Sequence, residues 1–253
     1  MSGHSHWASI KHKKGAADAK KGKVFSKMAK LIMIAAKQGG GDPNTNIKLK
    51  YAMDKAREYN MPKDNVERAV KKGTGELEGV IFEETSYEGY GPSGVAVMAQ
   101  VLTDNRKRTT AELRKIFEQY GGNLGEANCV AFMFELKGRM SIPVEKVNED
   151  DLMTAVLDAG AENMENIGDA YEITCEPKLL ESVKSALIKK GYNVTSGDVS
   201  KVPKSLVKVE EPNVANKIIN LMDALQEHDD VQDVFANFDI PDEIIASLKR
   251  DEE

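Results

Sequence analysis

The sequence has few cysteines, no long apolar run and no apolar segment near its start, which are features of disulfide-rich, membrane and secreted proteins. Its 253 residues include two cysteines and one tryptophan. Cys129 and Cys175 lie in apolar, strand-like runs without paired spacing, which predicts buried thiols and a reducing, cytoplasmic location. No apolar run approaches the roughly 20 residues that a membrane span needs. Lysines also follow the first residues, where a secretory signal would have an apolar segment. We therefore expect no membrane partner.

Motifs for catalysis and cofactor binding are missing as well. The sequence has no P-loop, H-E-x-x-H, G-x-S-x-G or C-x-x-C spacing. Residues 89–94 match G-x-G-x-x-G, but they precede a predicted strand and include a proline, so they indicate a turn instead of a dinucleotide site. Cys129 lies among apolar residues, where a thiol is unreactive. We expect no catalytic residue, no cofactor and no small-molecule substrate.

Metal ligands are also scarce. Three of the four histidines, His4, His6 and His12, lie near the start of the chain, but no cysteine or carboxylate pair accompanies them. Tetrahedral metal sites need three or four fixed ligands. The acidic groups 149–151 and 229–230 are typical of solvated helix and strand ends. We expect no metal site.

Charge is distributed unevenly along the chain. The net charge is −6, but residues 1–75 hold 17 basic and 6 acidic residues, a net charge of +11. The remaining residues hold 18 basic and 35 acidic side chains, a net charge of −17. Such asymmetry indicates that the basic segment binds a polyanion.

The apolar pattern predicts a helical first domain. Residues 1–22 are polar and aperiodic, which predicts a flexible basic arm that includes a short helix around residues 16–20. Apolar residues at spacings of three and four then predict three helices within 23–75, beginning near Val24, Thr45 and Pro62. Short connections between these helices favour a small bundle.

The remaining sequence predicts an α+β fold. We expect a central strand at 95–102, a helix with Thr109 and Glu112 at capping-box spacing, and a strand at 129–136. Residues 138–205 then show the order βαββαβ of a ferredoxin-like module. A further strand, helix and strand follow up to residue 240.

These patterns predict three domains in one chain, one helical and two α+β. The first is the 23–75 bundle, and the second is an α+β domain made of 80–137 plus 206–240. The third is the ferredoxin-like domain 138–205, inserted in the second, because residues 206–240 supply the helix that 80–137 lacks.

Two basic groups are candidate nucleic-acid contacts. Lysine and arginine neutralise phosphates, and an aromatic or histidine ring stacks on bases. The first group comprises Trp7, Lys11, His12, Lys13, Lys14, Lys20, Lys21, Lys23, Lys27, Lys30, Arg57, Lys63, Arg68, Lys71 and Lys72. The second comprises Asn105, Arg106, Lys107 and Arg108, at a predicted helix start whose free N–H groups attract phosphate. Solvated charged faces are the alternative interpretation of both groups.

Several motifs resemble the YebC/PmpR family, to which the mitochondrial translational activator of cytochrome oxidase subunit one is similar. They are Gly3–Trp7, Ile10–Lys14, Asn60–Asn65, Lys71–Gly75, Tyr87–Pro92 and Thr103–Arg106. His6 departs from the family pattern, which usually has lysine there. The resemblance implies a helical domain and two α+β domains, one inserted in the other. It also implies a non-enzymatic cytoplasmic protein, labelled a transcriptional regulator that binds DNA.

Other family members look like translation factors that act on the ribosome, especially at proline runs. The alternative function is therefore a ribosome-associated translational activator that binds ribosomal RNA. No helix-turn-helix, zinc finger or basic zipper is visible, and a lysine arm with an aromatic residue suits irregular RNA. An enzyme with a site between the α+β domains and a protein scaffold using the acidic domains are hypotheses of other classes.

Overall fold

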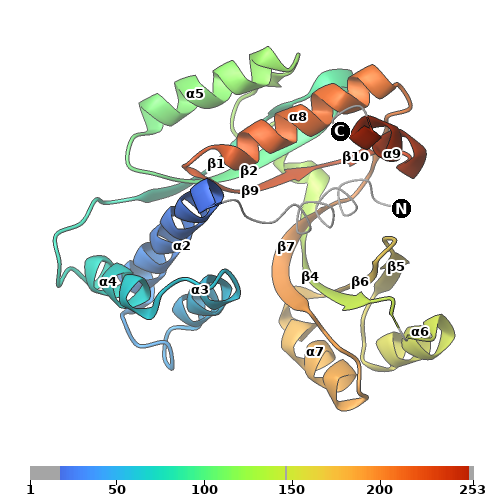
Figure 1. The fold of residues 1–253 in the computed structure, drawn as a ribbon, viewed down its shortest axis with the longest axis horizontal. Coiled ribbons are helices and arrows are strands. Elements are labelled where there is room, and N and C mark those ends of the chain that lie inside the picture. The colour runs from blue at the N-terminus through green and yellow to red at the C-terminus, as the bar shows by residue number, and fades with distance from the viewer. Residues whose placement is uncertain (1–17, 146, 251–253) are drawn as a thin grey trace.

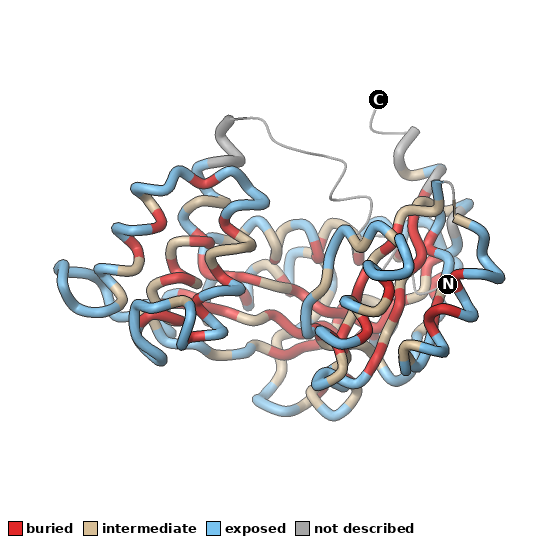
Figure 2. Tube along the Cα trace, turned by 90° about the horizontal axis from the view of Figure 1, so that it is seen from below, coloured by how far each residue is buried: buried red, intermediate tan, exposed pale blue. Residues whose placement is uncertain are grey.

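The computed structural model describes residues 18–145 and 147–250. Figure 1 shows three parts: a helical bundle of α2–α4, a sheet covered by α5 and α8, and a second sheet with α6 and α7. Figure 2 shows that buried residues follow the strands and the inner sides of the helices, whereas the loops are exposed. The expected class, an α+β protein with a helical N-terminal part, is confirmed.

The helical bundle consists of α2 (Asp18–Gly39), α3 (Ile47–Glu58) and α4 (Lys63–Thr74). Its core contains aliphatic side chains from all three helices, including Ile32, Leu49 and Val66. The buried Asn46 caps α3, since its side chain accepts a hydrogen bond from the backbone N–H of Leu49 at 3.1 Å. Helix α2 begins six residues before the predicted start, so residues 18–22 of the predicted arm are helical.

A close approach of α2 and α4 depends on Gly73. A Cβ atom there would lie 2.4 Å from the carbonyl oxygen of Met33 and 2.8 Å from Cβ of Ala36. We expect Gly73→Ala to lower the free energy of unfolding by about 1–3 kcal/mol, the usual cost of overpacking. Gly22→Ala is the matched control, since nothing lies within 4 Å of its Cβ position. It should stabilise α2 by up to about 1 kcal/mol. Urea denaturation measures both, and a stabilising Gly73→Ala would contradict the helix packing.

The first sheet has the strand order β3-β1-β2-β9 and is antiparallel throughout. Its strands are β1 (Glu83–Tyr90), β2 (Ala96–Thr103), β3 (Asn123–Leu124) and β9 (Val231–Ala236). Strand β2 is central and almost wholly buried, as its continuous apolar run predicts.

Two helices, α5 (Arg106–Gln119) and α8 (Pro212–Glu227), cover one face of this sheet. The opposite face packs against the 3-10 turn at Ala131–Met133 and the start of β4. Two short strands, β8 (Val207–Lys208) and β10 (Phe238–Asp239), form a separate parallel sheet. The final helix, α9 (Asp242–Arg250), was not expected from the sequence.

The second sheet has the order β5-β6-β4-β7, as expected for a ferredoxin-like βαββαβ module. Its elements are β4 (Phe134–Pro143), α6 (Glu149–Asp158), β5 (Asn163–Asn166), β6 (Ala170–Cys175), α7 (Leu180–Lys189) and β7 (Ser196–Pro203). The module lies between β3 and β9 in the chain, and both of those strands belong to the first sheet. The inserted arrangement is therefore confirmed, whereas the exact domain limits stay a prediction.

The predicted strand 129–136 is wrong in its first half. The buried carboxylate of Glu88 accepts hydrogen bonds from the backbone N–H groups of Val130 and Ala131, both at 2.8 Å. These bonds hold the chain in a turn until β4 begins at Phe134. Strand β4 then continues through Gly138 to Pro143, so two strands predicted separately are one.

Candidate nucleic-acid interface

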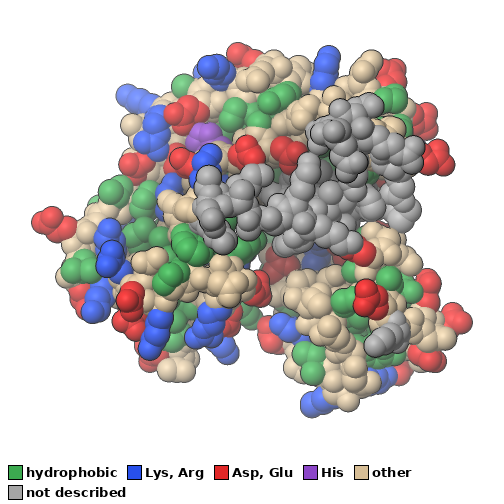
Figure 3. All heavy atoms as spheres, in the orientation of Figure 1, with side chains coloured by type: hydrophobic (Ala, Val, Ile, Leu, Met, Phe, Trp, Pro, Cys, Tyr) green, Lys and Arg blue, Asp and Glu red, His purple; other side chains and the backbone are tan. Residues whose placement is uncertain are grey.

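The bundle presents most of its basic side chains to solvent. Nine of them are exposed: Lys23, Lys37, Lys48, Lys50, Arg57, Lys63, Arg68, Lys71 and Lys72. Figure 3 shows several Lys and Arg side chains at the lower left, over the bundle. Lys37, Lys48 and Lys50 are outside the predicted set, although the sequence shows Lys37 beside the Gly39 helix end.

The ion pairs on this surface are weak. Arg57 contacts Asp54 at 2.7 Å and Lys63 contacts Glu67 at 3.6 Å, but all four side chains are largely exposed. Exposed pairs of this kind contribute about 0–1 kcal/mol, so a phosphate can replace the carboxylate. Among the described residues, no carboxylate lies within 4 Å of the basic groups of Arg68, Lys71 and Lys72, which all belong to α4. We call these three residues the α4 cations.

For seven residues of the first predicted basic group, no side chain is described. Trp7, Lys11, His12, Lys13 and Lys14 are outside the described residues. Lys20 and Lys21 belong to the first turns of α2, but only their backbone is described.

Two predicted contacts, Lys27 and Lys30, do not face solvent. Their residues are only 8% and 9% exposed. Lys27 donates a hydrogen bond to the carbonyl oxygen of Gln226 in the last turn of α8, where a cation is favourable. Lys30 contacts the loop between α8 and β9. These lysines therefore join the bundle to the first sheet domain and are not available to nucleic acid in this structure.

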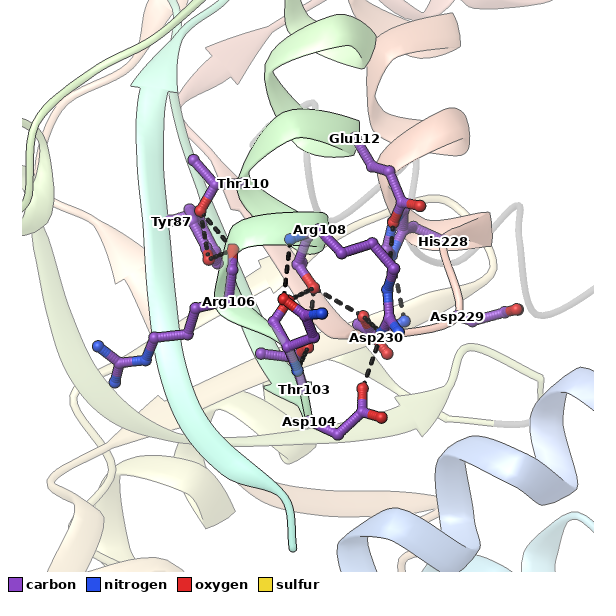
Figure 4. A network of polar contacts seen from close by, with 12 residues as sticks. Tyr87, Thr103, Asp104, Arg106, Arg108, Thr110, Glu112, His228, Asp229 and Asp230 are labelled. Carbon is purple, nitrogen blue, oxygen red and sulfur yellow. Dashed lines mark hydrogen bonds and ion pairs between the residues drawn. The ribbon is translucent and has the colours of Figure 1, made fainter. Parts of the chain in front are cut away.

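The carboxylate of Asp230 is the centre of that junction, and Figure 4 shows its contacts on the side of the sheet domain. Its side chain is 4% exposed. One oxygen, Oδ1, accepts a hydrogen bond from Lys30 at 2.7 Å. The other, Oδ2, accepts from Arg108 at 2.9 Å and from the hydroxyl of Thr109 at 2.7 Å. We call this group of four residues the Asp230 cluster.

The cluster keeps Asp230 ionised. Burial by itself would raise the pKa of this carboxyl group, but hydrogen bonds from Lys30, Arg108 and Thr109 outweigh it and hold the pKa well below its usual range. The same contact, together with a hydrogen bond to Asp104, raises the pKa of Arg108. Both groups are therefore charged near neutral pH.

In the second predicted basic group, both arginines have carboxylate partners within the protein. Asn105 caps α5 by accepting from the backbone N–H of Arg108, so the predicted cap, Thr109, is wrong. Arg106 contacts Glu83 at 2.8 Å, and Arg108 contacts Asp104 and Asp230. Among the described residues, Lys107 is the one cation of this group without a carboxylate within 4 Å.

A second set of side chains around Asp230 consists of residue types that can bind metal ions, but their ligand atoms already have partners within the protein. One ligand atom from each of Glu112, His228 and Asp230 lies within 4.8 Å of the others. However, Nδ1 of His228 accepts from the backbone N–H of Asp230, and Nε2 lies 2.9 Å from Glu112. Lys30 and Arg108 already neutralise Asp230. A cation would have to displace these partners, so the donor set does not fit a metal ion.

Comparison with known proteins defines the family. Residues 5–76 match the TACO1/YebC protein N-terminal domain, and residues 82–238 match the TACO1/YebC second and third domain. Together these matches cover most of the chain. The chain belongs to the TACO1/YebC family.

Individual relatives match over nearly the full length. A "Probable transcriptional regulatory protein" from Dictyoglomus turgidum is 55% identical over 249 residues, which is 98% of this chain and 100% of the relative. Another of that name from Syntrophobacter fumaroxidans is 51% identical over 248 residues, with the same coverage. The crystal structure of a conserved hypothetical protein from Aquifex aeolicus is 46% identical, with a TM-score of 0.83. That match covers 93% of this chain and 97% of the other.

In the part of the chain that the structure describes, no helix is both long and apolar enough to cross a lipid bilayer.

Proposed function

We propose that this chain is a non-enzymatic, cytoplasmic regulatory protein that binds nucleic acid, and that it regulates transcription by binding DNA. The relatives' names support a regulatory role. The two free cysteines, Cys129 and Cys175, suit a reducing compartment.

The observation that carries this proposal is the excess of exposed positive charge on the bundle. Nine basic side chains are exposed there, against five acidic residues in the same 22–75 segment. Two of those acids, Asp54 and Glu67, already contact Arg57 and Lys63. A surface of this kind attracts the phosphate backbone, with counterion release as the driving force.

The proposed contact residues differ from the full predicted set. We retain the arm residues, Lys20, Lys21 and Lys23, together with Arg57, Lys63 and the α4 cations. We omit Lys27, Lys30 and Arg108, because each has its charge directed to a partner within the protein. Asn105, Arg106 and Lys107 remain as a secondary contact, in which Arg106 would exchange Glu83 for a phosphate.

The test is binding of the full chain to fluorescent duplex DNA and to a structured ribosomal RNA fragment, measured by anisotropy between 50 and 300 mM salt. We expect binding whose affinity falls linearly on a log–log plot as salt rises. Tighter binding to DNA than to RNA would support the transcriptional role. A strong preference for the RNA would instead favour the ribosome-associated alternative, and no binding to either at low salt would refute the proposal.

A further inference from the structure

Three lysines of α2 form a stripe along one side of the helix, in which Lys27 and Lys30 are buried against the protein and Lys23 is exposed at its edge. Lys23, Lys27 and Lys30 are spaced four and three residues apart, which places them on one side of the helix. Lys23 lies 3.9 Å from Asp229, Lys27 donates to the end of α8, and Lys30 contacts both Asp230 and the carbonyl oxygen of Asp229. The stripe thus docks on the junction between α8 and β9.

The contact between Lys30 and Asp230 is much less exposed than two other contacts between side chains that the structure shows from the bundle to the rest of the protein. Lys55 reaches Asp233 at 3.7 Å with both side chains about 40% exposed. Tyr51 reaches Glu181 of the ferredoxin-like module through an exposed hydrogen bond of 3.0 Å. The Lys30 and Asp230 side chains, by contrast, are 11% and 4% exposed. A charge pair sheltered from water is screened less by salt and is costly to separate.

The position requires a carboxylate. Both oxygens of Asp230 accept hydrogen bonds, one from Lys30 and the other from Arg108 and Thr109. An asparagine has the same shape but replaces one oxygen with an NH₂ group. In one orientation of the amide the NH₂ group would face Lys30, and in the other it would face Arg108 and Thr109. Asp230→Asn must therefore lose the hydrogen bonds to one of the two oxygens.

We infer that Asp230 is a positioning residue that fixes the helical bundle on the first sheet domain, and thereby sets the geometry of the nucleic-acid-binding surface. It does so by tying α2, whose N-terminal end continues the basic arm, to the first turn of α5, which carries the secondary contact residues. The second half of this inference rests on the proposed function, whereas the first half concerns domain orientation alone.

The opposite role is an inhibitory one, in which Asp229 and Asp230 occupy lysines that would otherwise contact phosphate. The two roles predict opposite signs. Loss of a positioning residue weakens nucleic-acid binding, whereas loss of an inhibitory residue strengthens it. The burial of Lys27 and Lys30 favours positioning, because the bundle would have to leave the sheet domain before either lysine met a phosphate.

Domain orientation is measured first, without nucleic acid. Spin labels are placed on cysteines at the exposed positions Glu58 in α3 and Glu118 in α5, and electron–electron distances are recorded. The native thiols label poorly, since Cys175 is buried and burial raises the pKa of the half-buried Cys129. We expect one narrow distance population in the otherwise unmodified chain. Asp230→Asn should add a second population or broaden the first.

Two further variants make this result decisive. Lys30→Gln removes only the bundle's side of the contact and leaves Asp230 with Arg108 and Thr109, so the sheet domain should fold normally. It should broaden the distances as Asp230→Asn does. Asp54→Asn makes the same chemical change at an exposed pair and should leave them unchanged. Unaltered distances in both Asp230→Asn and Lys30→Gln would overturn the inference.

Nucleic-acid affinity is measured next on the same variants, with the duplex DNA and RNA probes. We expect Asp230→Asn and Lys30→Gln each to weaken binding about 5-fold or more, the lower end of typical coupling between sites. Tighter binding would overturn positioning in favour of inhibition. If the unmodified chain binds neither probe, the proposed function fails, and the distance measurement still decides whether Asp230 orients the bundle.

Discussion

Replacing Arg57 and the α4 cations (Arg68, Lys71 and Lys72) with glutamine together should weaken nucleic-acid binding by roughly 10³-fold in dilute buffer. An exposed unit charge 4 Å from a phosphate contributes about 1 kcal/mol, and each 1.4 kcal/mol changes affinity tenfold. The slope of log affinity against log salt should also flatten by about 0.9 for each lost contact with duplex DNA. Anisotropy titrations at four or five salt concentrations measure both quantities.

The matched control changes four exposed lysines outside the bundle: Lys178, Lys189, Lys190 and Lys208. This variant has the same net charge as the first, but its substitutions lie on the ferredoxin-like module and on β8. It should bind nearly as well as the unmodified chain, with an almost unchanged slope. Equal losses in the two variants would mean that overall charge, and not the bundle surface, governs binding.

Asp230→Asn should lower the apparent free energy of unfolding by about 3–5 kcal/mol, the usual effect of removing one partner of a buried charge pair. The large size follows from the number of donors left without an anion, which include Lys30 and Arg108. Asp54→Asn, at an exposed pair, should change stability by about 1 kcal/mol at most. Urea denaturation followed by circular dichroism compares the two variants.

The effect of Asp230→Asn should depend on pH. The pKa of Asp230 is lowered in the folded protein, while an unfolded aspartate has a pKa of about 3.9. The carboxylate therefore contributes its full stabilisation above that unfolded value, and the contribution is lost as pH falls toward the folded pKa. The difference between the unmodified chain and Asp230→Asn should be constant from pH 5 to 7 and shrink below about pH 4. A difference that stays the same at pH 3 would contradict the role of the ionised carboxylate.

Local patterns in the sequence were sufficient for most of the fold. The spacing of Ile32, Leu49 and Val66 with their neighbours predicted the three bundle helices, and the apolar run of β2 predicted a central strand. The order of the elements predicted the ferredoxin-like module. These features depend on periodicity and on turn residues, both of which are visible within a few residues of one another.

Features set by distant contacts were not predictable in the same way. The spacing of Lys23, Lys27 and Lys30 is typical of a stripe that contacts solvent or nucleic acid. The buried carboxylate that accepts a hydrogen bond from Lys30 belongs to Asp230, which lies 200 residues away in the sequence. Thr109 and Asn105 are both good helix caps. Thr109 instead donates to Asp230, so Asn105 is left as the cap. The turn before β4 depends similarly on Glu88, about forty residues earlier.

The central claim is that the exposed basic face of the bundle holds a nucleic acid. The most direct measurement is ultraviolet crosslinking in cells, followed by mass spectrometry of the crosslinked peptides and sequencing of the attached nucleic acid. We predict crosslinked peptides from the arm and from α3 and α4, with few from α6 and α7. Crosslinks confined to the ferredoxin-like module, or none above a control without irradiation, would contradict the claim.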